Sequence, residues 1–320
     1  MVTLSRRALL RALGLSGAAG LAGCAAAPET AAPVAGQPVH WRTIQGGFLA
    51  PAPLPAGTPP RLPSGMFVRW TAPAAVALRG ADLLVADLGT ARLWRADLAG
   101  NVVTGIAGAP VGVGVALALG PDLSAWVLDP GSRQVLRYSR DGLLLQSQRI
   151  GLTTSRPVGL ALADGGLTLL LADGAGAQWS EQRGPGGLLI TVAPERAGGH
   201  RISGVDGLAL GRDGVFVLDR LAGVVHRVSR QGAVLQTLGE GELKQPVALA
   251  VDRQDRVYVH DALDGSIKRL AAGAPVQRWT AGVLGVQRIG GLAVDGLMLA
   301  VTDALSGSVV LHSFMHEAPT

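Results

Sequence analysis

Aspartates recur at a regular interval along this 320-residue chain, and they are the first residues whose type and spacing could do chemistry. Their residue numbers differ successively by 42, 44, 46, 42 and 42. Carboxylates gathered on one rim of a repeat protein could bind a cation such as Ca²⁺. Each aspartate, however, ends an apolar stretch and precedes a turn, where its oxygens can accept backbone N–H bonds two residues on. We therefore interpret the set as structural turn residues: Asp87, Asp129, Asp173, Asp219, Asp261 and Asp303.

A second group of aspartates ends or adjoins the first apolar run of three units. If those runs surround a channel, Asp206, Asp252 and Asp295 are the candidate metal ligands, and calcium is the ion that such oxygen ligands would take. The other ingredients of a catalytic site are not gathered in the sequence. The histidines are scattered, and no Gly-x-Ser-x-Gly elbow, phosphate loop or His/Cys cluster occurs. The residues alone therefore predict no cofactor and no catalytic group.

The elements that carry these aspartates are short apolar runs. Each unit, for example Val247–Asp261, contains two runs of about five residues rich in Val, Leu and Ala, separated by turn formers. A third run follows, such as Ser266–Leu270, and a fourth is visible in most units, such as Pro275–Thr280. Four strands in a repeat of about 40–45 residues are typical of a β-propeller blade. A TIM barrel would need amphipathic helices, which the intervals lack. We predict an all-β, six-bladed propeller with four-stranded blades.

The ends of the repeat array predict how the ring closes. The last unit supplies three strands, ending near Phe314, so its fourth strand must come from the N-terminal side. We predict that Met66–Thr71 (MFVRWT) pairs with Ser308–Ser313 and leaves no long sheet edge unpaired.

Several units resemble the NHL repeats of six-bladed propellers. The matching segments are Gln245–Asp261 and Arg156–Asp173, and the resemblance extends over about three quarters of the chain. The Asn-His-Arg run that the family often places after the aspartate is absent. An arginine instead recurs eight residues past the aspartate, at Arg95, Arg137, Arg227 and Arg269. The resemblance therefore implies the fold but no ligand surface. Six-bladed propellers also include calcium-dependent lactonases and lyases, which is the alternative function we keep open.

The N-terminus is similar to an export signal. Leu21-Ala22-Gly23-Cys24 resembles the lipobox of bacterial lipoproteins, which implies that Cys24 is acylated and becomes the mature N-terminus. Ser5–Arg11, with Arg6 and Arg7, resembles the twin-arginine export motif, and an ordinary basic region is the alternative. Ala25 follows the cysteine in place of the aspartate that retains such proteins at the inner membrane, which favours the outer membrane.

These signals divide the chain into a signal peptide (1–23), an Ala/Pro-rich lipidated tether (24–64) and the propeller (65–320). Residues 25–64 contain nine of the 19 prolines, as expected for an extended tether. Three of the 28 basic residues and none of the 23 acidic ones lie in residues 1–23, so the rest is nearly neutral. This balance gives no support to nucleic-acid binding.

We therefore expect a lipid-anchored protein of the bacterial envelope, facing the periplasm from the outer membrane. Its propeller would be a non-catalytic scaffold that binds envelope proteins through the loops at one mouth of the ring, with the long segment Arg183–Ser203 among them. An envelope polysaccharide is the second choice of partner. The alternative is a calcium-dependent lactonase, hydrolase or lyase with its site in the channel.

Overall fold

The structure is a computed structural model that describes residues 36–51, 65–150, 156–163, 166, 168–173, 178–183, 189–192, 202 and 204–314. All of them belong to one compact unit, Ala35–Thr320. They form β-strands joined by turns, and no helix among them is long and apolar enough to cross a membrane. The signal residues Arg6, Arg7 and Cys24 and most of Arg183–Ser203 lie outside the described residues.

Four sheets repeat the same up-and-down order of consecutive antiparallel strands. They consist of β8 (Ala116–Leu119), β9 (Ala125–Asp129), β10 (Gln134–Tyr138) and β11 (Leu144–Arg149); β12 (Pro157–Ala163), β13 (Thr168–Asp173), β14 (Gln178–Arg183) and β15 (Leu189–Val192); β16 (Gly207–Leu210), β17 (Val215–Asp219), β18 (Val224–Val228) and β19 (Val234–Leu238); and β20 (Pro246–Val251), β21 (Val257–Asp261), β22 (Ser266–Leu270) and β23 (Gln277–Thr280).

Two further sheets include strands from the N-terminal side of the repeats. One contains β24 (Ile289–Asp295), β25 (Met298–Asp303) and β26 (Ser308–Ser313), with β1 (Val39–Ile44) as its fourth strand. The other contains β4 (Pro73–Arg79), β5 (Asp82–Asp87), β6 (Arg92–Asp97) and β7 (Val102–Ile106), followed outward by β2 (Gly46–Leu49) and β3 (Phe67–Arg69).

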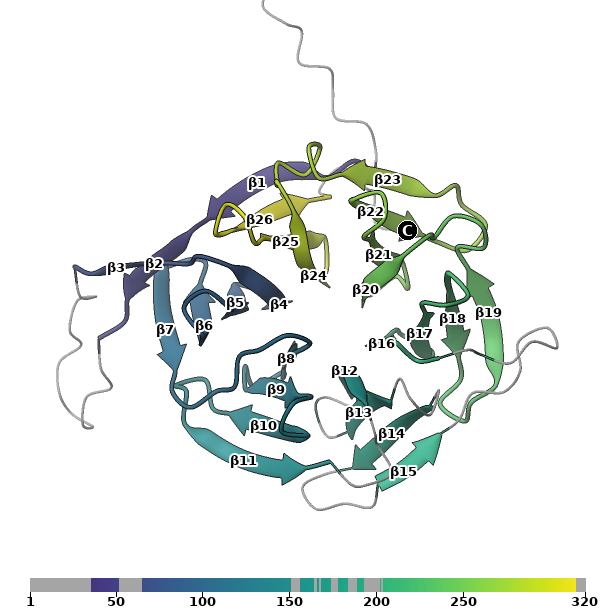
Figure 1. Ribbon diagram of the computed structural model, residues 1–320, viewed down its shortest axis with the longest axis horizontal. Helices are drawn as coiled ribbons and strands as arrows, with labels where there is room; N and C mark the ends of the chain where they lie inside the picture. Colours follow the sequence, from purple (N-terminus) through teal and green to yellow (C-terminus); the bar gives the residue numbers. More distant parts are fainter. Residues whose placement is uncertain are drawn as a thin grey trace, which may run out of the picture. The chain divides into compact units, whose positions relative to one another are not determined.

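The sheets are arranged around a common centre, as Figure 1 shows, and their innermost strands line the cavities of a central channel. Their innermost strands, β4, β8, β12, β16, β20 and β24, contact one another in that order, and β24 contacts β4. The beginnings of these strands gather at one end of the channel and their last residues at the other. We name these ends the start face and the end face. The predicted all-β propeller is confirmed.

The prediction of uniform four-stranded blades is wrong for one sheet. Five sheets have four strands, whereas the sheet of β4–β7 has six. β2 pairs in parallel with β7, Phe48 opposite Val102, and β3 pairs antiparallel with β2. The outer edge of β7 offers free backbone groups, and a strand that follows β1 in the chain can use them. Sequence periodicity does not reveal such an addition.

The assignment of Met66–Thr71 as the strand that joins the last sheet is also wrong. β1 pairs antiparallel with β26, from Val39 opposite Ser313 to Ile44 opposite Val309, with a bulge at His40/Arg42. Residues 67–69 instead form β3 at the outer edge of the six-stranded sheet. Both β1 and β2 lie within residues 24–64, which the sequence predicts to be a tether, so the sheets begin earlier than residue 65.

The hydrophobic core lies between adjacent sheets. One cluster joins Leu83, Val85 and Trp94 of the six-stranded sheet with Val309 and Leu311 of β26. Equivalent clusters lie between the other neighbouring sheets, because each sheet buries both of its faces against the next one. This packing holds the turns at either face in fixed positions.

Candidate functional site

The channel is the first place to look for a site. At the start face it opens into a cavity of about 450 Å³, lined by the first residues of the inner strands, such as Ala74, Val158, Val247 and Gly290. The lining is made of Ala, Val, Leu and Gly, with Asp206 as the one ionisable side chain among the described residues. General acid–base or metal chemistry needs several polar groups that converge, which this lining does not offer.

Asp206 is already paired. Its Oδ1 accepts a hydrogen bond from Arg156 Nη2 at 3.1 Å, and its backbone N–H donates to Leu218 O at 2.8 Å. The Arg156 side chain is largely exposed, whereas that of Asp206 is mostly covered. This ion pair joins the segment before β12 to the segment before β16, so its geometry connects two neighbouring blades.

Asp252 lies at the opposite end of the channel and is buried in a satisfied network. Its carboxylate accepts hydrogen bonds from Gln254 N at 2.9 Å, Arg256 Nε at 2.6 Å and Tyr258 Oη at 3.1 Å. These donors hold the inner hairpin turn of the β20–β23 sheet. A carboxylate with this set of donors is a turn residue rather than an open ligand.

Asp295 also lies at the end face and connects three sheets. Its Oδ2 accepts from Gly80 N at 2.7 Å and its Oδ1 from Arg253 Nη2 at 3.1 Å. The structure therefore separates the three candidate ligands, with Asp206 at the start face and Asp252 and Asp295 at the end face. No group of three or more His, Cys, Asp or Glu suited to a metal occurs among the described residues.

The six recurring aspartates end the second strand of their sheets, at the start face. Several accept the N–H two residues on, as Asp129 does from Gly131 at 3.0 Å and Asp303 from Leu305 at 3.1 Å. Some also accept N–H groups from the segment that leads into the inner strand of the same sheet. Asp303 binds Gln287 N and Arg288 N in this way, at 2.8 and 3.1 Å. The carboxylate of Asp303 thus holds the segment that leads into the inner strand of its own sheet.

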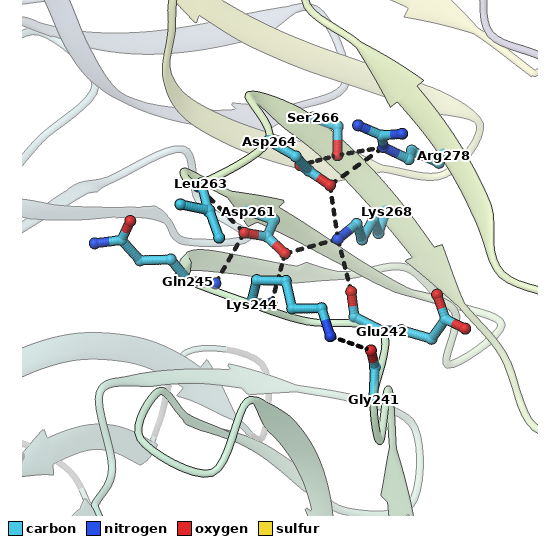
Figure 2. Close-up of polar contacts among 10 residues, drawn as sticks. All are labelled: Gly241, Glu242, Lys244, Gln245, Asp261, Leu263, Asp264, Ser266, Lys268 and Arg278. Carbon is cyan, nitrogen blue, oxygen red and sulfur yellow. Dashed lines mark hydrogen bonds and ion pairs between the residues drawn. The ribbon is translucent and has the colours of Figure 1, made fainter.

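Asp261 differs from the other five repeat aspartates because its carboxylate accepts a hydrogen bond from a lysine ammonium. Lys268 Nζ lies 2.7 Å from Asp261 Oδ2, 2.9 Å from Asp264 Oδ2 and 2.7 Å from the backbone oxygen of Glu242, as Figure 2 shows. The side chains of Lys268 and Asp261 are both buried. Burial opposes the charge on Lys268, but the hydrogen bonds to Asp261 and Asp264 outweigh it, and the pKa of this ammonium is raised. A lysine held charged in this way is not a nucleophile.

Two buried histidines adjoin this part of the fold. Burial lowers the pKa of His226, and it lowers the pKa of His260 as well, so both are neutral near pH 7. His226 Nδ1 bonds Thr237 Oγ1 at 3.0 Å, whereas His260 Nδ1 has no partner among the described residues. Neither ring lines the channel cavities described above. Their environment is that of packed histidines.

The four recurring arginines make contacts within the fold. Arg95 pairs with Asp82 at 3.0 Å, and Arg137 pairs with Asp122 at 2.6 Å. Arg227 lies 3.3 Å from Asp255, and the Arg269 guanidinium lies over the Trp279 ring. Three of the four therefore hold the inner hairpin turns at the end face. These residues serve the fold rather than a ligand.

The feature that sequence reasoning missed is a row of exposed leucines at the start face. After three successive repeat aspartates the chain reads Asp-x-Leu-x-Gly, and the leucines are Leu221, Leu263 and Leu305. They are 82%, 68% and 57% exposed. The closing glycines Gly223, Gly265 and Gly307 have positive φ, which sets the turn and turns the leucines outward. We name the three turns that carry Leu221, Leu263 and Leu305 the leucine turns.

The leucine turns belong to three consecutive sheets whose inner strands β16, β20 and β24 contact one another. Val247, at the cavity rim, and Val283, in the segment after β23, add exposed apolar side chains at the same face. A single exposed leucine needs no explanation, but an exposed leucine at the equivalent turn of three consecutive blades gives one face of a rigid scaffold a repeated apolar character. Such a surface is suited to binding another macromolecule rather than to chemistry.

Comparisons with known proteins agree with the fold but do not assign a function. No family model and no curated protein sequence matches the chain. Solved structures do match it. A catalytically inactive variant of virginiamycin B lyase from Staphylococcus aureus with quinupristin is 14% identical, with a TM-score of 0.53, and the match covers 76% of this chain and 84% of that one.

Two further solved structures give the same result. A protein of unknown function from Bacteroides thetaiotaomicron is 15% identical, with a TM-score of 0.56 over 76% of this chain and 70% of that one. Hydrazine synthase from Kuenenia stuttgartiensis is 11% identical, with a TM-score of 0.54 over 78% and 97%. At such identities the likeness shows the propeller fold alone, because one fold hosts many functions.

Proposed function

We propose that this protein is a binding scaffold whose start face docks envelope proteins through the leucine turns. The observation that carries the proposal is that Leu221, Leu263 and Leu305 occupy the same turn position in three consecutive sheets and are all largely exposed. Burying them in the free protein would add to stability, so their exposure is best explained by a partner that covers them. Loops on a rigid scaffold are where recognition residues usually lie.

The same proposal includes the finer features of the fold and the anchor. The six-stranded sheet is the sixth blade, with β2 and β3 added to its outer edge, and β1 closes the ring by pairing with β26. The blades are NHL-like, and the chain is exported by the twin-arginine route through Arg6 and Arg7. Cys24 is acylated, and the lipid holds the propeller at the periplasmic side of the outer membrane. Incorporation of labelled palmitate into the chain, and its loss in Cys24→Ser, tests the anchor directly.

The alternative of a calcium-dependent hydrolase or lyase has no specific support in the described channel. The start-face cavity is lined by aliphatic side chains apart from Asp206, and the three candidate carboxylates lie at opposite ends of the channel, each bonded to donors of its own. The scaffold proposal therefore includes no metal and no catalytic residue.

Affinity purification after brief crosslinking in membranes tests the scaffold. A variant with serine at all three leucine turns should lose a protein that co-purifies in stoichiometric amount with the unmodified chain. The matched control replaces Leu143, Leu144 and Leu145 with serine, since these are 67%, 54% and 54% exposed at the start of β11. Capture of the same protein by all three chains, or about one calcium ion per chain and no partner, would refute the proposal.

A further inference from the structure

A second exposed surface lies on the two strands added outside the repeats. Phe48 of β2 and Phe67 of β3 are paired across the strands, and their rings meet edge to face with centroids 5.5 Å apart. The two residues are 41% and 48% exposed, and Met66 beside them is exposed as well. Figure 1 shows β2 and β3 at the periphery, beyond β7. We name Phe48, Met66, Phe67 and Arg69 the β2–β3 surface.

The exposed aromatic side chains that the structure describes lie in this N-terminal region. Among the residues whose side chains the structure describes, the exposed large aromatics are Trp41, Phe48 and Phe67, all within β1–β3. The aromatic side chains of the repeats that the structure describes are buried: Trp94, Trp126, Tyr138, Phe216, Tyr258, Trp279 and Phe314. The fold does not require the exposed rings, because backbone pairing attaches β2 to β7 and β3 to β2.

The segment of sequence that contains this surface carries charge of one sign. From Thr30 to Ala81 the sequence contains four arginines and no aspartate or glutamate. Arg69 is exposed and lies two residues after Phe67, on the same side of β3 because side chains alternate along a strand. Exposed aromatic rings beside an exposed arginine match the boundary between anionic lipid headgroups and acyl chains.

We propose that the β2–β3 surface binds an anionic lipid bilayer. Phe48 and Phe67 enter the region between headgroups and acyl chains, and Arg69 binds lipid phosphate. Arg42 is not part of this contact, since its guanidinium is bonded to Leu98 O at 2.6 Å and lies 3.3 Å from Asn101 Oδ1. The contact is independent of the leucine turns, which belong to other sheets, and independent of acylation at Cys24. It would hold the propeller in one orientation at the membrane.

Brominated-lipid quenching of a tryptophan placed in the surface tests this proposal. The full-length chain with Phe67→Trp and the full-length chain with Leu144→Trp are bound to phosphatidylglycerol-containing vesicles, and the spectrum of the parent chain is subtracted. Both replaced residues are about half exposed and lie in outer strands of different sheets. We expect the probe at 67 to be quenched several-fold more than the probe at 144. Equal quenching, or none at 67, would overturn the proposal.

A second measurement separates lipid binding from a folding defect. The Phe48→Ser/Phe67→Ser chain and the Arg69→Glu chain should partition about tenfold or more weakly into anionic vesicles, while the Leu144→Ser/Leu145→Ser control partitions normally. Circular dichroism shows whether the variants stay folded. Unchanged partitioning of the folded double variant would overturn the proposal, and so would a photocrosslinker at position 67 that captures protein and no lipid.

Discussion

Lys268 Nζ lies 2.7 Å from Asp261 Oδ2 in the interior of the β20–β23 sheet, and neither side chain is open to solvent. Asp261 also accepts the N–H groups of Lys244 and Gln245, at 2.8 and 2.9 Å. Burial disfavours the charged carboxylate, but the Lys268 ammonium and these N–H groups outweigh it and lower the pKa of Asp261. The Asp261 carboxylate and the Lys268 ammonium are therefore both charged across the physiological pH range.

Replacing Lys268 by methionine should destabilise the fold. The change leaves Asp261 buried with its charge uncompensated, which costs about 3–5 kcal/mol in comparable buried pairs. Lys244→Met is the matched control, because its ammonium is exposed and binds only Gly241 O among the described residues. Urea denaturation of both variants measures the free energy of unfolding. Equal stabilities for Lys268→Met and the control would contradict the assigned role of the pair.

The repeat aspartates should differ in importance according to their burial. Asp303 is buried and accepts three backbone N–H bonds, so Asp303→Ala should cost about 2–4 kcal/mol by leaving those donors unsatisfied. Asp129 is partly exposed and binds Gly131 N and Ser132 Oγ, so Asp129→Ala should cost about 1 kcal/mol or less. Thermal unfolding of both variants shows which of the two substitutions destabilises the protein more. A larger loss for Asp129→Ala would show that the carboxylates have another role.

Acidification should weaken the seam between β1 and β26. Burial lowers the pKa of His312 to about 4, although the hydrogen bond to Leu284 O opposes the shift, and the neighbouring His40 lowers it further. A histidine with a folded pKa below its unfolded value of about 6.5 binds protons in the unfolded state first, so its contribution is lost as pH falls from about 6.5 to 4. The loss amounts to roughly 2–4 kcal/mol.

The variant His312→Gln isolates this effect. It should flatten the pH dependence of the free energy of unfolding between pH 6.5 and 4, whatever its effect at pH 7. His40→Gln should leave most of this pH dependence in place, because burial, and not the neighbouring His40, is the main cause of the lowered pKa of His312. The carboxylates with lowered pKa, such as Asp261 and Asp303, lose their contribution at lower pH, below about 4. If the free energy of unfolding of His312→Gln depended on pH as steeply as that of the parent chain, His312 would be excluded as the source of the pH dependence.

β1 should be essential to the last sheet. Ile44 is buried where β1 pairs with β26, and it packs in the core cluster with Val309 and Leu311. Ile44→Ala should therefore cost about 2–4 kcal/mol. Val39, at the other end of the same strand, is exposed, and Val39→Ala should be nearly neutral. Protease resistance and denaturation curves measure the difference. A neutral Ile44→Ala would argue that β1 does not complete the sheet in solution.

Part of this architecture could be predicted from the sequence because it depends on local periodicity. The apolar runs and turns between Pro73 and Ser313 predict the strands of each sheet, and the propeller follows from their repetition. The partner of β26 could not be predicted, since Val39–Ile44 and Met66–Thr71 are both suited to a strand and only packing selects between them. The parallel pairing of β2 with β7 likewise has no local signature.

The candidate site shows the same limit. Sequence position already indicates that Asp206 precedes an inner strand whereas Asp252 and Asp295 follow the apolar run, which places them at opposite ends of a channel. The Asp-x-Leu-x-Gly pattern is visible as well, but an apolar residue in a turn can be packed or exposed. The exposed fractions of Leu221, Leu263 and Leu305 depend on the neighbouring sheets and come only from the structure.

The most direct test of the central claim is a photocrosslinking amino acid at Leu263, compared with the same probe at Leu144. In cells that make the full-length protein, the scaffold account predicts one or a few defined protein adducts at position 263. These adducts should be lost when Leu221 and Leu305 are changed to serine, and they should be absent at position 144. No adduct at 263, or the same adducts at both positions, would contradict the claim that the leucine turns bind a partner.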